Sequence, residues 1–188
     1  MDEVGRGPIA GPVTIAVCAC SRGLLAQMPT RHPLVQDSKK ITPSARTEIA
    51  RQLRSDGQLR FVVASVSAKE INQRGISRAL RTAVARGLAR LGCAPSDIEI
   101  RLDGRLYAPK KYPRQSTIVR GDATEWIIGA ASIVAKVHRD AYMVRQAKTF
   151  PRYGFERHKG YGTKDHYAAL AKHGLSPQHR RSFLSRFV

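Results

Sequence analysis

Hydrophobic residues along the chain form short apolar runs that alternate with longer amphipathic stretches, a pattern typical of α/β proteins. Two runs rich in β-branched residues predict strands over residues 12–20 and 60–66. Shorter apolar runs predict strands over residues 98–102 and 117–119. The first few residues also indicate extended backbone, so the chain offers several strands for one sheet.

Apolar positions three or four residues apart predict helices between and after these strands. One helix begins after Thr42, with Pro43 in its first position. Residues 67–70 (Ser-Ala-Lys-Glu) have the form of a capping box and predict a single helix to about Leu91. A long helix is expected over residues 123–148.

The length of the chain limits its organisation. A chain of 188 residues with 42% hydrophobic residues can build one sizeable core, so we expect a single domain over residues 1–188. Three cysteines, an odd number, favour buried thiols in a reducing compartment. No stretch is apolar enough to cross a bilayer, and we expect a cytoplasmic protein.

Basic residues far outnumber acidic ones, with 33 Lys plus Arg against 14 Asp plus Glu and a net charge of +19. This balance predicts a polyanionic partner, and nucleic acid is favoured over an acidic membrane. A basic nucleic-acid-binding protein without catalysis shares the same composition and remains an alternative. It would, however, gain nothing from acids placed beside phosphate.

Carboxylates stand at the ends of three predicted strands in this acid-poor chain. Asp2 and Glu3 lead into the turn Gly5 to Gly7, while Asp103 and Asp122 each stand beside a glycine after a strand. Functional groups gather at such strand ends in α/β sheets. An aspartate beside a glycine is commonly part of a turn, and Asp122 alone could cap the helix that follows it. Four converging carboxylates would repel one another, and divalent cations would compensate for that repulsion.

The glycine-arginine-glycine turn beside the acidic pair offers backbone amides and a guanidinium group, which suit phosphate. Carboxylates for hard cations next to groups for phosphate are the elements of metal-dependent phosphodiester chemistry. Four histidines near the carboxy terminus match no compact metal motif in their spacing, so we expect them near phosphate or at the surface. They are His158, His166, His173 and His179.

The chain resembles the bacterial ribonuclease HII family in ordered blocks that cover nearly its whole length. The blocks are Asp2–Pro8 with Ala10–Val13, Asp37–Lys40, Leu102–Gly104, Ile118–Asp122, Gly129–Val137 with Arg139 and Asp140, His158–Thr163, and His179–Phe183. The resemblance implies an RNase H-like fold, with a mixed five-stranded sheet flanked by helices. It also implies a basic helical part over about residues 140–188 that faces the substrate.

The first strand is expected to be truncated, because related chains carry further residues before the acidic pair and only Met1 precedes it here. Either the protein begins upstream, or this strand is nearly absent. We expect that restoring upstream residues would raise stability and metal-dependent activity.

The resemblance implies that Asp2, Glu3, Asp103 and Asp122 are the catalytic, metal-binding carboxylates and hold two Mg²⁺ or Mn²⁺ ions. One ion would activate water and the other would stabilise the departing 3′ oxygen. The implied activity hydrolyses the RNA strand of RNA/DNA hybrids and cuts 5′ of single ribonucleotides in duplex DNA, as in ribonucleotide excision repair. The products would carry 5′-phosphate and 3′-hydroxyl ends, and a monomer is expected.

The family also implies how a ribonucleotide is recognised. The backbone of Gly5, Arg6 and Gly7 would contact the 2′-hydroxyl, which distinguishes RNA from DNA. Tyr161 would pack on the sugar at the RNA-to-DNA junction. An ordinary tight turn and a loop anchor are the alternatives for these residues. This turn argues against ribonuclease HIII, and with Tyr161 it argues against an RNase H-like nuclease that ignores the 2′-hydroxyl.

Three further residues are expected to meet the nucleic-acid backbone. Ser38 and Lys39 match the Asp-Ser-Lys segment of the family and would contact phosphates, although a solvated lysine is the alternative. Lys136 lies on the long predicted helix, where it either reaches phosphate or pairs with a carboxylate. Asp140, on the same helix, is expected to be a structural partner and not a metal ligand.

Overall fold

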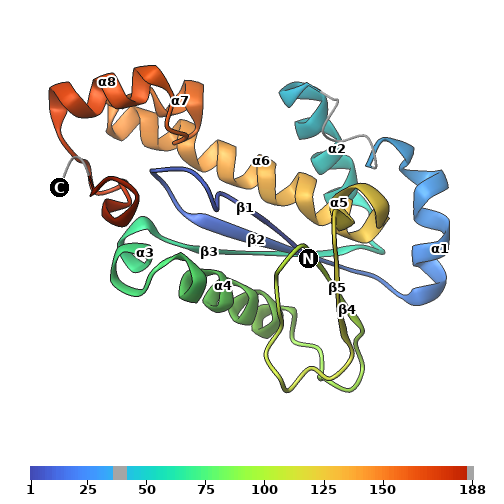
Figure 1. The fold of residues 1–188 in the computed structure, drawn as a ribbon. Coiled ribbons are helices and arrows are strands. Elements are labelled where there is room, and N and C mark those ends of the chain that lie inside the picture. The colour runs from blue at the N-terminus through green and yellow to red at the C-terminus, as the bar shows by residue number, and fades with distance from the viewer. Residues whose placement is uncertain (36–41, 186–188) are drawn as a thin grey trace.

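The computed structural model describes residues 1–35 and 42–185, and Figure 1 shows a central sheet with helices on both faces. The strands are β1 (Asp2–Val4), β2 (Val13–Ala19), β3 (Arg60–Val66), β4 (Ile100–Asp103) and β5 (Gln115–Ile118). The first three form an antiparallel ladder in the order β1-β2-β3, and β4 pairs with β5 in parallel.

Met1 joins the two ladders. Its amino group donates to the carbonyl of Arg101 (2.7 Å), and its own carbonyl accepts from the N–H of Asp103 (3.0 Å). These bonds place β4 beside β1, so the strands follow one another in the order β3-β2-β1-β4-β5. The predicted α/β class with a mixed sheet is confirmed, although regular pairing forms a three-stranded and a two-stranded ladder.

Helices cover both faces of the sheet. They are α1 (Arg22–Arg31), α2 (Pro43–Ser55), α3 (Ala68–Arg74), α4 (Ile76–Leu91), α5 (Gly121–Thr124), α6 (Trp126–Thr149), α7 (Phe155–His158) and α8 (Lys164–His173), with 3₁₀ turns at Pro33–Val35, Pro151–Tyr153 and Arg181–Phe183. In Figure 1, α3 and α4 lie below the sheet, α6 crosses above it, and α7 and α8 stand at one end. No described helix is long and apolar enough to span a membrane.

Two predicted helices prove to be interrupted. The capping box at Ser67 is confirmed, but the single helix to Leu91 is wrong, because Gly75 takes a φ of +76° and separates α3 from α4. The continuous helix over residues 123–148 is also wrong. Glu125 is extended and separates α5 from α6, while its carboxylate pairs with Arg101 of β4 at 2.6 Å.

Strand β2 is buried on both faces, which explains its continuous apolar sequence. Val13, Ile15 and Val17 pack in the core on the side of α4. Ala16 and Cys18 pack in a second core on the side of α6. A third core joins the segment after β1 to the helices at the carboxy-terminal end. It contains Ile9, Ala10, Met143, Ala147, Tyr153, Phe155, Leu170 and Leu184.

Candidate active site

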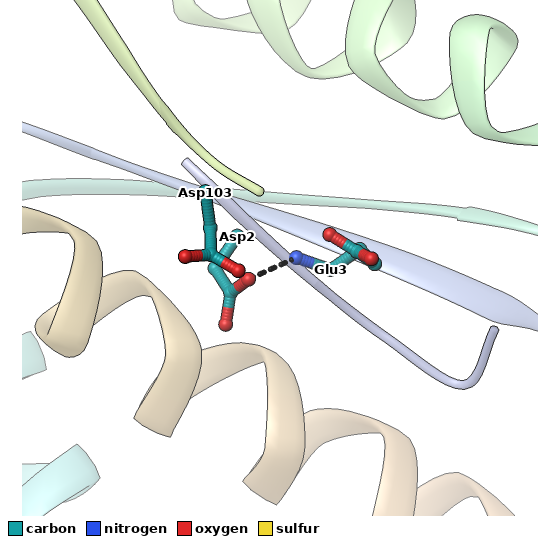
Figure 2. A group of neighbouring side chains, drawn as sticks. All are labelled: Asp2, Glu3 and Asp103. Carbon is teal, nitrogen blue, oxygen red and sulfur yellow. Dashed lines mark hydrogen bonds between the residues drawn. The ribbon is translucent and has the colours of Figure 1, made fainter. Parts of the chain in front are cut away.

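Three of the four predicted carboxylates meet where β1 lies beside β4. One oxygen each from Asp2, Glu3 and Asp103 lies within 4.8 Å of the others, and we call these three residues the carboxylate cluster. Figure 2 shows the carboxylates of Asp2 and Asp103 next to each other, with Glu3 turned to the side along β1. The bonds of Met1 hold this arrangement, because they fix the two strands side by side.

Burial makes the charged forms of Asp2 and Glu3 unfavourable. It raises the pKa of Asp2 to about 6, with the charge of Asp103 adding to the shift and a hydrogen bond from Ser132 of α6 opposing it. Burial, followed by the charges of Asp2 and Asp103, raises the pKa of Glu3 to about 7. Arg6 opposes that shift only weakly, from 4.0 Å.

One oxygen of the carboxylate cluster has no partner within the described part of the chain. Glu3 Oε2 is buried and accepts no hydrogen bond there. A buried polar atom without a partner costs free energy. Hard divalent cations prefer carboxylate oxygens, and such a cation would satisfy this atom and offset the mutual repulsion of the acids. The residues present therefore fit a divalent metal ion.

Asp122, the fourth predicted carboxylate, lies beside the cluster. Its backbone N–H donates to Asp103 Oδ1 over 3.3 Å. A Cβ on the preceding Gly121 would lie 2.6 Å from Ile128 Cδ1 and 3.3 Å from Asp103 Oδ1, so a larger residue there would require the Ile128 side chain to shift. The structure thus brings the backbone of Asp122 to the site, while the metal-competent group found among the described residues contains the other three acids.

The predicted glycine-arginine-glycine turn follows β1 directly, and Arg6 and Gly7 are exposed. Gly5 has a φ of +87°, a conformation that favours glycine. The carbonyls of Gly5 and Arg6 both accept hydrogen bonds from Arg180, at 2.7 and 3.1 Å. The turn therefore has a fixed conformation at the surface beside the carboxylate cluster.

Tyr161 is 43% exposed, and two cations approach its ring. Lys136 Nζ lies 5.9 Å and the guanidinium of Arg139 lies 6.0 Å from the ring centroid. Lys136 also donates to Asp140 at 2.9 Å, so the structure shows the predicted alternative of a carboxylate pair. Ser38 and Lys39 lie outside the described residues.

Sequence reasoning missed a buried basic group behind these loops. Its members form what we call the arginine–histidine cluster: Arg139, His158, His166, His179 and Arg180. The expected surface position is wrong for His158, His166 and His179, which are buried, while His173 is partly exposed. The rings of His158 and His166 stack at 4.2 Å, and the Nε2 atoms of His166 and His179 are 3.0 Å apart.

One signal for this cluster was present in the sequence. Four of its five members fall inside the blocks that resemble ribonuclease HII. The basic side chains of these residues favoured a surface position, since a sequence does not distinguish a buried arginine from an exposed one. Ser132, which supports Asp2, also lies inside one of these blocks, Gly129–Val137.

A separate cleft of about 570 Å³ opens beside Met1, between β2 and β4. Its walls include Val17, Cys18, Leu88 and Ile100, and the carboxylate cluster does not line it. The candidate site therefore lies outside this cleft.

The fold and the site together define a class of protein. Carboxylates at a strand junction, an exposed glycine turn and a net charge of +19 are the combination found in metal-dependent nucleases. The profile of one such family, ribonuclease HII, matches residues 1–186. The chain belongs to the ribonuclease HII family and is a ribonuclease H enzyme.

Known proteins support this assignment along the whole chain. The ribonuclease HII of Chlamydia pneumoniae is 39% identical over 183 residues, which cover 97% of this chain and 81% of that protein. The ribonuclease HII of Archaeoglobus fulgidus, solved in complex with PCNA, is similar with a TM-score of 0.75 and 25% identity, covering 95% of this chain and 91% of that one. Bst-RNase HIII in complex with Mn²⁺ has a TM-score of 0.68 and 19% identity, covering 91% and 68%, and shows the fold alone.

Proposed function

We propose that this enzyme hydrolyses the RNA strand of RNA/DNA hybrids and cuts duplex DNA on the 5′ side of a single embedded ribonucleotide. The products would carry 5′-phosphate and 3′-hydroxyl ends, and the cellular role would be ribonucleotide excision repair. The observation that carries the proposal is the carboxylate cluster, in which Glu3 Oε2 has no partner among the residues described, directly beside the turn at Gly5 to Gly7.

We assign Asp2, Glu3, Asp103 and Asp122 as the catalytic residues that would hold two divalent ions, Mg²⁺ or Mn²⁺. Bound divalent cations supply an activated water and stabilise the charge that develops on the leaving oxygen. The chain's own part is to hold these oxygens close together, and a bound cation would favour their deprotonated forms. Ser132 helps by hydrogen-bonding Asp2 and so favouring its ionised form.

Substrate contacts are assigned to residues around this site. The backbone of Gly5, Arg6 and Gly7, exposed at the last two residues, suits the 2′-hydroxyl and its neighbouring phosphate, and the exposed ring of Tyr161 suits a sugar. Lys136, held by Asp140, adds positive charge beside that ring. Ser38 and Lys39 complete the proposed contacts with phosphate.

We further propose that residues 1–188 act as one catalytic domain, whose basic part from about residue 140 to 188 faces the nucleic acid. The third core, which packs that part against the segment after β1, supports this arrangement. We expect the enzyme to act as a monomer in the cytoplasm.

The decisive experiment uses a labelled DNA duplex that contains one ribonucleotide, with Mg²⁺ or Mn²⁺ present. A single cut on the 5′ side of the ribonucleotide is expected, and it should be absent from an all-DNA duplex and from the Asp122→Asn variant. Cleavage of the all-DNA duplex would contradict the proposed specificity. Full activity of Asp122→Asn would remove that residue from the proposed metal site.

A further inference from the structure

Two arginines behind the active-site loops are completely buried, and among residues 1–35 and 42–185 their guanidinium groups donate hydrogen bonds to backbone carbonyls alone. Arg180 donates to the carbonyls of Gly5 (2.7 Å), Arg6 (3.1 Å) and Gly11 (2.9 Å). Arg139 donates to those of Ala10 (3.0 Å), Pro12 (2.9 Å) and Lys159 (2.9 Å). Both side chains have an exposed fraction of 0%.

Neither arginine forms an ion pair with a carboxylate of residues 1–35 or 42–185. Burial lowers the pKa of both guanidinium groups, and the charge of Arg139 helps to lower that of Arg180, to about 9. Burying an unpaired charge is costly unless hydrogen bonds compensate for it. The six carbonyls supply that compensation. Since apolar side chains could fill the same space without buried charges, the two arginines indicate a role beyond packing.

Peptide geometry connects Arg180 with the outer face of the turn. A trans peptide is planar, and its N–H points away from its C=O. All described peptide bonds are trans. Because Arg180 draws the carbonyls of Gly5 and Arg6 inward, the N–H groups of Arg6 and Gly7 must point away from it. Both residues are exposed, and neither N–H donates to an atom of the described residues.

Arg139 also contacts the glycine turn, at Gly5. A Cβ added to Gly5 would lie 2.2 Å from Arg139 Nε, so this side chain packs directly against the backbone there. Arg139 also holds the carbonyl of Lys159, two residues before Tyr161. The pair therefore connects the glycine turn with the segment that carries the tyrosine.

From this geometry we propose that Arg180 and Arg139 are positioning residues that aim the N–H groups of Arg6 and Gly7 at the ribonucleotide. They do not touch the substrate themselves. The inference rests on the proposed function, in which this turn contacts the 2′-hydroxyl. Successive N–H groups that face the same way form a recognised binding feature for anions and other acceptors.

Arginine is required at position 180 because one rigid fork reaches three carbonyls. A lysine ammonium is a compact charge on a flexible stem and cannot hold the same three atoms in place. Asn72 fixes the segment on both sides of Arg180. Its side chain donates to the carbonyl of His179 (3.0 Å) and accepts from the N–H of Arg181 (2.8 Å).

The first test measures the turn in the free protein. Backbone ¹⁵N relaxation should give order parameters of about 0.85 for the Arg6 and Gly7 amides in the wild-type protein and below about 0.6 in Arg180→Lys. Arg60→Lys is the matched control, because Arg60 also donates to a backbone carbonyl, that of Leu91, at a distant place. Unchanged order parameters in Arg180→Lys would overturn the proposal whether or not the proposed function holds.

The second test measures discrimination by binding, in an Asp103→Asn background that leaves the substrate intact. The probes are a duplex with one ribonucleotide and the same duplex in all-DNA form. Arg180→Lys should reduce the preference for the ribonucleotide about tenfold and leave the Kd for all-DNA nearly unchanged. A merely structural role would weaken both affinities equally and so contradict the positioning role.

Asn72→Ala provides a milder variant in case Arg180→Lys does not fold. It leaves both arginines in place and should reduce the same preference about threefold. An unchanged preference in every one of these variants that folds would overturn the inference. A parent protein that shows no preference for the ribonucleotide would instead refute the proposed contact with the 2′-hydroxyl.

Discussion

The carboxylate cluster is partly buried and the arginine–histidine cluster is buried, and the two differ in whether each polar atom has a hydrogen-bond partner. In the carboxylate cluster, Glu3 Oε2 has no partner among the described residues, and the pKa values of Asp2 and Glu3 are raised. In the arginine–histidine cluster, every histidine ring nitrogen and each guanidinium group has a partner inside the protein.

The histidine network is complete with neutral rings. His158 Nε2 donates to the Tyr153 carbonyl (2.7 Å), and its Nδ1 accepts from the Gly160 N–H (3.1 Å). His166 Nδ1 donates to the Tyr161 carbonyl, so its Nε2 accepts from His179 Nε2. Only one set of tautomers satisfies these partners. The comparison shows that the fold itself supplies the hydrogen-bond partners of the arginine–histidine cluster, whereas the carboxylate cluster needs a bound cation.

The largest expected effect is on catalysis. Asp103→Asn should lower the rate of cleavage by at least about a hundredfold, because metal binding contributes several kcal/mol to the transition state. Single-turnover cleavage of a ribonucleotide-containing duplex measures this loss. Asp97→Asn, which changes an exposed acid outside the cluster, should keep the wild-type rate. Equal losses in both variants would show that the carboxylate cluster is not the metal site.

Substitutions in the two clusters should change the free energy of unfolding in opposite directions. Arg180→Met leaves three carbonyls without their donor and should lower the free energy of unfolding by about 3 kcal/mol. In a protein of this size that corresponds to a fall of roughly 6–12 °C in Tm. In metal-free buffer at pH 7.5, Asp2→Asn should raise stability by about 1 kcal/mol, because it removes a buried like charge.

Urea unfolding of both variants measures these changes. A loss of stability in Asp2→Asn without metal would mean that the acids are already satisfied inside the fold. Unchanged stability in Arg180→Met would mean that the carbonyls of Gly5, Arg6 and Gly11 do not depend on this guanidinium group.

Metal should stabilise the enzyme more at neutral than at acidic pH. The folded-state pKa values of Asp2 and Glu3, about 6 and 7, exceed the ordinary values. Without metal, the stability that these two protonated acids contribute is therefore lost as the pH rises through their folded-state pKa values. Mn²⁺ binds the deprotonated form and should restore about 2.7 kcal/mol at a hundredfold excess over Kd. Thermal melts with Mn²⁺ and with EDTA, at pH 5 and pH 7.5, test this. An equal shift at both pH values would contradict it.

The histidines should produce a smaller effect of the opposite sign. Burial lowers the pKa values of His166 and His179 to about 4, from an ordinary 6.5. The unfolded chain therefore binds more protons between these values, and stability should fall as the pH drops from 6.5 to 4. In an Asp2→Asn, Glu3→Gln double variant, which removes the opposing acids, Tm should fall by several degrees over that range. A flat profile would show that the ring network tolerates protonation.

Local patterns predicted much of the fold. Strands β2 and β3, the cap at Thr42 and the capping box at Ser67 follow from short-range sequence signals, and all four are present. The interruptions at Gly75 and Glu125 were missed, because each depends on how the chain must turn to pack the following helix. Strands β4 and β5 were displaced by one or two residues, since their limits depend on pairing between distant segments.

The sequence by itself determined the chemistry of the site, because scarce acids beside glycines in a strongly basic chain indicate metal and phosphate. Only the tertiary structure decided which groups are buried together. The bonds of Met1 bring β4 to β1 and so bring Asp103 to Asp2. Folding also turns Arg139 and Arg180 inward, where carbonyls from distant segments replace water. The physical reason is that a charged residue has the same identity at every position, while its role depends on the partners that the fold supplies.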